Sequence, residues 1–208
     1  MALELWLAFA AASTALLVVP GPTVMLVVSY ALGKGRASAL ATVPGVALGD
    51  LTAMTVSLAG AGAILAASAT LFTVLKLAGA AYLVWLGIQL WRAGDSLDAL
   101  TELRPQADRK RMFWNAYVVT ALNPKGIVFF VAFVPQFVDP AAPLLAQFAI
   151  LVATFVILAA VNVAIWALLA GQMRARFEQP ATLRLVHRIG GGFLIGAGLL
   201  TALTRRSA

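Results

Sequence analysis

Long apolar stretches alternate with short polar ones along the whole sequence. A transmembrane helix needs about 20 consecutive and mostly apolar residues. Segments that meet or approach this length run over residues 3–32, 38–66, 70–91, 113–137, 144–171 and 188–204. The pattern predicts an all-α, polytopic membrane protein with six transmembrane helices, the last of which is the shortest.

Basic residues gather in three of the polar stretches between these segments. Residues 33–37 hold two of them, residues 92–112 hold five and residues 172–188 hold four. The parts of the chain expected on the other side of the membrane hold three. Lys and Arg are enriched in the cytoplasmic loops of membrane proteins. We therefore expect the loops between segments one and two, three and four, and five and six to be cytoplasmic, with both termini outside.

The composition argues against several classes of protein. Hydrophobic residues make up 62% of the chain and charged residues 11%, against about 45–50% and about 25% in soluble domains. A soluble enzyme, a nucleic-acid-binding protein or a disordered protein needs far more polar surface than this. We assign the net charge of +7 to the cytoplasmic loops and expect no nucleic-acid partner.

Several kinds of reactive site are missing from the sequence. There is no Cys and a single His, His187, which excludes thiolate and multi-histidine metal sites as well as disulfides. No Walker-type phosphate loop and no nucleophile elbow occurs. We expect no enzymatic activity, no resident metal, no cofactor, and no ATP as the energy source.

Two features indicate an internal repeat. The third and sixth segments match in register at Gly79/Gly190, Tyr82/Phe193, Leu83/Leu194 and Gly87/Gly198. The first and fourth segments both contain a proline break near their middle. Apolar, glycine-rich helices can match by chance, but the two features together favour a repeat. One transmembrane domain over residues 1–208 would then comprise three helices in 1–91, a cytoplasmic loop in 92–112 and three helices in 113–208, as in the inverted repeats of secondary transporters.

The break in the first segment is Pro20-Gly21-Pro22. Each proline removes a backbone donor and disturbs the preceding turn, so we expect an unwound stretch. Within a membrane, the freed backbone groups must face protein or a water-filled cavity. A half-helix that begins near Thr23 would point free N–H groups at this cavity, where a carboxylate binds well. The alternative is a structural kink without a ligand.

The break in the fourth segment is Asn123-Pro124-Lys125-Gly126, near the middle of the segment. A charge at this depth costs several kcal/mol and by default marks a functional site. Lys125 therefore needs a partner or a water-filled path, and we favour this over snorkelling to the surface. We predict that Pro20, Gly21, Pro22, Thr23, Asn123, Pro124 and Lys125 line a substrate site.

Apart from Glu4 at the very start of the first segment, Asp50 is the only acidic residue inside an apolar segment. A carboxyl group placed between apolar surroundings and a nearby ammonium group can exchange a proton near neutral pH. We predict that Asp50 couples transport to protons, with Lys125 as its candidate partner. The alternatives are a purely structural ion pair and a solvated position near the membrane surface.

Asn162 lies in the fifth segment. Polar side chains inside membranes commonly bond neighbouring helices, and they can equally line a cavity. The sequence does not choose between these roles, and we include Asn162 among the candidate substrate-binding residues.

In this order, the motifs resemble those of the LysE/RhtB family of bacterial amino-acid exporters, over essentially the whole chain. They comprise the two proline breaks, the stretch from Gly45 through Asp50, the stretch from Lys76 to Gly87, Phe129-Phe130 and Pro135-Gln136-Phe137. The resemblance implies a multi-pass protein of the bacterial inner membrane. It also implies export of amino acids from the cytoplasm by the proton motive force, and a homodimer.

We expect the substrate to be a small neutral amino acid or a derivative, because Asp50 alone offers little to a strongly cationic substrate. In the mechanism we favour, the two halves of the molecule rock around the bound zwitterion. A proton from outside then binds Asp50, and the substrate is released. A metal-cation exporter of related architecture is the alternative, although zero Cys and one His leave few soft ligands.

Overall fold

The computed structural model describes residues 1–92, 108–139, 142–177 and 180–203. Helices account for most of these residues, and no strand occurs among them. The long helices are α1 (Leu3–Val18), α2 (Pro22–Lys34), α3 (Ala39–Ala67), α4 (Ala69–Arg92), α5 (Arg109–Ala121), α7 (Leu144–Phe177) and α8 (Pro180–Leu203). The all-α prediction is confirmed. Most of the predicted cytoplasmic loop 92–112 lies outside the described residues.

The first apolar segment is broken where the prolines stand. Helix α1 ends at Val18, α2 begins at Pro22, and the two are bent by 54°. Pro20 has no N–H to donate to the carbonyl of Leu16 one turn earlier, so α1 cannot continue. Proline is favourable in the first turn of a helix, which is where Pro22 lies. The predicted unwinding at this point is confirmed.

The fourth segment is also interrupted. Helix α5 ends at Ala121, and the short helix α6 (Pro124–Val128) follows after Leu122 and Asn123. The chain continues through a π-helical turn, η3 (Phe129–Phe133), and a 3₁₀ turn, η4 (Val134–Phe137). Asn123 caps α6, because its side-chain oxygen accepts a hydrogen bond of 3.1 Å from the backbone N–H of Lys125.

Helix α7 is apolar on two opposite faces. Phe155, Ala159 and Val163 face the protein and are buried, whereas Ile157 and Val161 are 62% and 52% exposed. Such a helix buries one face in the protein and needs an apolar environment for the other. The surrounding lipid supplies it, so the outward face identifies α7 as a membrane helix.

Three stretches of helix are long and apolar enough to cross a membrane among the residues described. They are Arg36–Gly60, Arg109–Phe137 and Leu144–Ala170, and the bent pair α1–α2 makes a fourth if it counts as one span. The protein is thus an all-helical membrane protein with three or four candidate spans. The count of six and the inverted repeat stay predictions.

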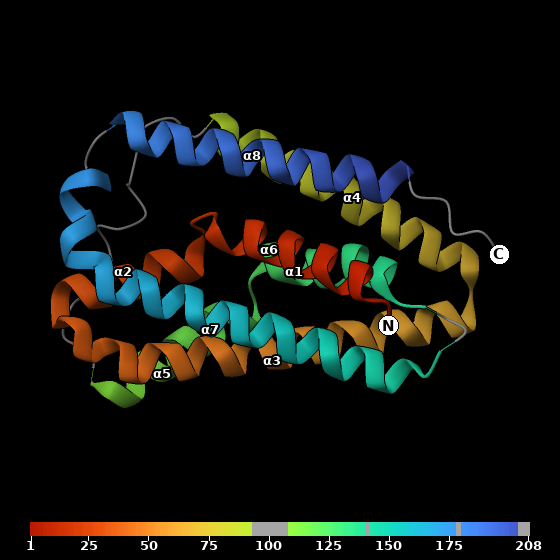
Figure 1. Ribbon diagram of the computed structural model, residues 1–208, viewed down its shortest axis with the longest axis horizontal. Coiled ribbons are helices and arrows are strands. Elements are labelled where there is room, and N and C mark those ends of the chain that lie inside the picture. Colours follow the sequence, from red (N-terminus) through yellow and green to blue (C-terminus); the bar gives the residue numbers. More distant parts are fainter. Residues whose placement is uncertain (93–107, 140–141, 178–179, 204–208) are drawn as a thin grey trace.

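Helices α4 and α8 lie side by side along one flank of the molecule, above the group that contains α1, α2, α3, α5 and α7 (Figure 1). Glycines allow this close approach. A Cβ atom on Gly87 would lie 2.6 Å from the carbonyl of Gly191 and 2.8 Å from the side chain of Ile195. A Cβ atom on Gly198 would lie 2.7 Å from both the carbonyl of Ala80 and the side chain of Val84.

The chain ends and the connections divide between the two ends of the molecule (Figure 1). The N-terminus, the end of α8 and the junction of α3 with α4 lie at one end. The end of α2, the start of α5, the end of α7 and the start of α8 lie at the other. This second group of connections is the one for which the basic residues predict a cytoplasmic location.

Candidate functional site

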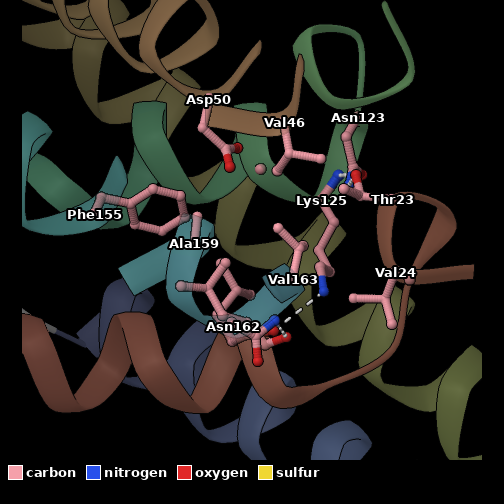
Figure 2. A pocket seen from close by; sticks show the side chains of 14 residues that line it. Thr23, Val24, Val46, Asp50, Asn123, Lys125, Phe155, Ala159, Asn162 and Val163 are labelled. Carbon is pink, nitrogen blue, oxygen red and sulfur yellow. Dashed lines mark hydrogen bonds between the residues drawn. The ribbon is translucent and has the colours of Figure 1, made fainter. Parts of the chain in front are cut away.

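A cavity of about 40 Å³ lies between the two broken segments, α3 and α7 (Figure 2). Its walls bring together most of the polar residues that the sequence singled out. The lining comprises Leu16, Leu17, Gly21, Thr23, Val24, Val46, Asp50, Asn123, Lys125, Gly126, Phe155, Ala159, Asn162 and Val163. Pro20, Pro22 and Pro124 shape the breaks but are not among the lining residues.

Lys125 reaches from α6 to the end of α1. Its Nζ atom donates hydrogen bonds of 3.1 Å to the carbonyl oxygen of Leu16 and 3.0 Å to that of Val19. These carbonyls are free because Pro20 has no N–H for Leu16, while Val19 lies beyond the end of the helix. A cation is favoured at a helix C-terminus, so the proline break creates the site that Lys125 occupies.

Asp50 faces the same cavity from α3 and is 7% exposed. Its neighbour Gly49 allows α3 to pack tightly on α5, since a Cβ atom there would lie 2.8 Å from the carbonyl of Tyr117. Within the described part of the chain, Asp50 has no hydrogen bond and no ion pair. Lys125 lines the same cavity, yet its ammonium group points away from Asp50 toward α1 (Figure 2).

A small hydrogen-bond network ties the two breaks together. The hydroxyl groups of Thr23 and Thr120 lie 3.2 Å apart. Asn123 donates from Nδ2 to the hydroxyl oxygen of Thr23 at 3.3 Å, while its Oδ1 atom caps α6. All three side chains are buried. Asn123 therefore bonds to residues at both breaks. Thr120 also belongs to this network, and the sequence analysis did not identify it.

Asn162 combines the two roles that the sequence left open. It lines the cavity from α7 and donates from Nδ2 to the carbonyl oxygen of Leu17 at 3.0 Å. At the end of α1, the carbonyls of Leu16, Leu17 and Val19 thus each accept a hydrogen bond from another segment of the chain.

The remaining walls of the cavity are apolar. Phe155, Ala159 and Val163 follow one face of α7, and Val24 and Val46 face them. The sequence analysis missed these residues, and only the helical spacing of the three on α7 could have grouped them. Sites for small molecules usually measure about 300–1,000 Å³, so a cavity of about 40 Å³ is too small for an amino acid in this arrangement.

A metal site finds no support in the same region. Among the described residues, no group of three or more His, Cys, Asp or Glu side chains could hold a metal ion. The chemistry of the cavity is that of one carboxyl group, one ammonium group, uncapped backbone and an apolar wall.

Comparison with known proteins identifies the family. Residues 14–205 match the LysE type translocators. The chain belongs to this family. The resemblance drawn from the motifs is confirmed, and the protein is a membrane translocator rather than an enzyme.

Individual relatives of this LysE type translocator carry efflux names. The chain is 34% identical to a homoserine/homoserine lactone efflux protein of Salmonella typhimurium over 207 residues, which cover 100% of each chain. It is 32% identical to an uncharacterized membrane protein of Vibrio cholerae over 205 residues, covering 99% of this chain and 100% of the other. A leucine efflux protein of Salmonella choleraesuis is 29% identical over 128 residues, covering 62% of this chain and 60% of the relative. No solved structure matches the translocator.

Proposed function

We propose that this translocator exports small neutral amino acids or their derivatives from the cytoplasm in exchange for protons. The observation that carries the proposal is the cavity in which the uncapped start of α2, the free carbonyls of α1, Lys125 and Asp50 meet. A zwitterionic amino acid needs a partner for its carboxylate and another for its ammonium group, and this cavity offers both.

The start of α2 suits the carboxylate group of the substrate. The first hydrogen bond within this helix runs from the N–H of Met25 to the carbonyl of Gly21, so the N–H groups of Thr23 and Val24 have no acceptor inside the helix. Gly21, at the N-cap position, supplies no side-chain cap. Free N–H groups and the positive end of the helix dipole together favour an anion.

Other groups around the cavity suit the ammonium group of the substrate. Asp50 and the free carbonyls at the end of α1 both attract a cation, and both line the cavity or border it. Together with the start of α2, these groups complement the two charged ends of an amino acid. The half-helices of transporters bind substrates and ions with their ends in the same manner.

Asp50 is the proton carrier in this proposal. It is the one acidic side chain among the described residues that line the cavity. An ionised carboxylate without a partner is costly in a buried position, so the arrangement with Lys125 on the α1 carbonyls favours protonated Asp50. Binding and release of this proton on opposite sides of the membrane would drive export.

Alternating access would follow from two halves in inverted orientation. Under the register of the repeat, Gly87 corresponds to Gly198 and Ala80 to Gly191. The repeat therefore predicts that a contact between Gly87 and Gly191 is matched by one between Gly198 and Ala80. The structure contains both contacts. This agreement supports six spans arranged as inverted repeats of three, which would rock around the closed cavity.

The side chain of the substrate would meet the apolar wall formed by Phe155, Ala159 and Val163. This environment suits a small neutral side chain, in line with relatives named for efflux of homoserine and of leucine. We place the protein in the bacterial inner membrane, with the basic connections in the cytoplasm. A homodimer, as the resemblance implies, completes the proposal.

Counterflow into proteoliposomes tests the function. Purified protein would face a panel of amino acids, including L-homoserine and L-leucine, at two pH gradients. We expect saturable uptake of a few small neutral amino acids, with uphill transport only when the gradient supplies protons. A Glu4→Gln variant, altered at an exposed position outside the cavity, should behave as the parent protein. If correctly folded protein takes up none of the amino acids tested, the proposal is refuted.

A further inference from the structure

The ammonium group of Lys125 occupies a site that the main chain builds. The carbonyls of Leu16 and Val19 are free because Pro20 ends α1, and they converge on one nitrogen atom at 3.1 and 3.0 Å. A primary ammonium group has three donors and no acceptor. The ammonium group of an amino acid has the same donors and the same charge, so it fits the carbonyl pair as Lys125 does.

Asp50 offers Lys125 a second place to bind. Of the described residues that line the cavity, Asp50 on α3 and Lys125 on α6 are the charged ones, while α1, α2 and α7 contribute no charged residue. Asp50 has no partner among the residues described and is 7% exposed. The long, flexible stem of a lysine lets its ammonium group change direction without movement of the backbone. In Figure 2 both side chains border the same space from different sides.

We propose that the carbonyl oxygens of Leu16 and Val19 form the ammonium site for the substrate, and that Lys125 competes for this site by moving between these carbonyls and Asp50. The inference rests on the proposed function and deepens it. It assigns the ammonium group of the substrate to the end of α1, and it gives Lys125 the role of expelling the substrate.

The protonation of Asp50 decides which position Lys125 takes. When Asp50 is ionised, the buried carboxylate attracts the ammonium group of Lys125, and the carbonyl pair is open to substrate from the cytoplasm. When a proton from outside binds the carboxylate, the neutral acid releases Lys125. The ammonium group then returns to the two carbonyls and displaces the substrate. The structure, with Lys125 on the carbonyls, corresponds to the state in which Asp50 is protonated.

The effect of Asp50 on substrate binding distinguishes competition by Lys125 from a simple role of Lys125 in capping α1. If Lys125 only capped α1, the state of Asp50 would not change the affinity for substrate through Lys125. If Lys125 competes with the substrate, removal of the Asp50 charge holds Lys125 on the carbonyls and weakens substrate binding. Removal of Lys125 as well should then restore binding, because the competitor is gone.

A double-mutant cycle on the full chain in detergent micelles tests this, with equilibrium binding of L-homoserine as the readout. We expect Asp50→Asn to weaken binding by about tenfold or more, within the range typical of coupled sites. We expect the double variant Asp50→Asn/Lys125→Met to recover most of that loss and to bind independently of pH. Lys34→Met, at an exposed position at the end of α2, is the matched control and should leave every value unchanged.

Recovery of binding in the double variant supports the competition. Unchanged binding in Asp50→Asn, or no recovery in a folded double variant, overturns it. A parent protein that transports no amino acid in counterflow contradicts the proposed function instead, so the two failures are distinguishable.

A second measurement is independent of the substrate. Lys125→Ala leaves the carbonyl pair without its ammonium group, and ethylammonium chloride supplies one of similar size. We expect ethylammonium to raise the melting temperature of Lys125→Ala and to leave that of the parent protein unchanged, with tetraethylammonium chloride as the control that cannot donate. Equal responses of both proteins to ethylammonium would overturn the assignment of the site.

Discussion

Asn123 carries two interactions whose loss has a calculable cost. Its Oδ1 atom caps α6 through the N–H of Lys125, and its Nδ2 atom bonds the hydroxyl of Thr23 across the two breaks. The variant Asn123→Ala removes both. Loss of a helix cap costs typically about 1 kcal/mol. A hydrogen bond between helices in a membrane protein contributes about 0.6 kcal/mol on average.

The two terms predict a loss of about 1.5 kcal/mol for Asn123→Ala. For a protein of this size, that loss lowers the melting temperature by about 3–6 °C. Thermal unfolding of purified protein in detergent, followed by the exposure of buried groups, measures it. Because the cap orients α6, and with it Lys125, we also expect slower counterflow than in the parent protein.

Asn123→Ser is the matched control. The Ser hydroxyl is a good N-cap but is too short to reach Thr23, so only the smaller term should be lost. We therefore expect a decrease of about 1–2 °C for this variant. If Asn123→Ala is as stable as the parent protein, or if both variants lose the same amount, the cap and the link between the breaks do not have the assigned roles.

Three further predictions follow from other parts of the molecule. Gly87→Ala places a Cβ atom 2.6 Å from a carbonyl of α8 and should cost about 1–3 kcal/mol in thermal unfolding, whereas Gly60→Ala meets no atom within 4 Å and should cost little. Asp50→Asn should abolish uphill transport and its dependence on the pH gradient in proteoliposomes, while retained pH dependence would exclude Asp50 as the proton carrier. Because the chain has no Cys, single cysteines at Lys34 and Glu4 allow labelling of intact cells with a membrane-impermeant maleimide, and only the cysteine at position 4 should react if the predicted orientation is right.

Local chemistry made the elements of the fold predictable. The apolar stretches located most of the helices, since a membrane helix must be long and apolar whatever it packs against. The last two boundaries were wrong: α7 continues to Phe177 and α8 already begins at Pro180, so most of the polar stretch 172–188 is helical. The prolines at positions 20, 22 and 124 predicted both breaks, because a missing N–H disturbs a helix independently of its surroundings. In these respects the sequence contains the information without any knowledge of tertiary contacts.

The sequence alone did not reveal which groups the polar residues contact. The sequence grouped Asp50 with Lys125, and the structure places them at one cavity without an ion pair. The partners of Lys125 are main-chain carbonyls of residues more than 100 positions away, which carry no side-chain signal. Thr120 was missed because one threonine in an apolar segment resembles many others, and only its distance to Thr23 shows its role.

In the proposed rocking motion, the link between Thr23 and Asn123 would make the two breaks a pivot. Helices α1 and α2 extend from one side of it, and α5 and α6 from the other. A small rotation about such a point moves the nearby cavity little, while the far ends of the helices sweep wide arcs. Spin labels near the two breaks would then keep their separation throughout the cycle. Labels at the helix ends would report opening on one face of the membrane and closing on the other.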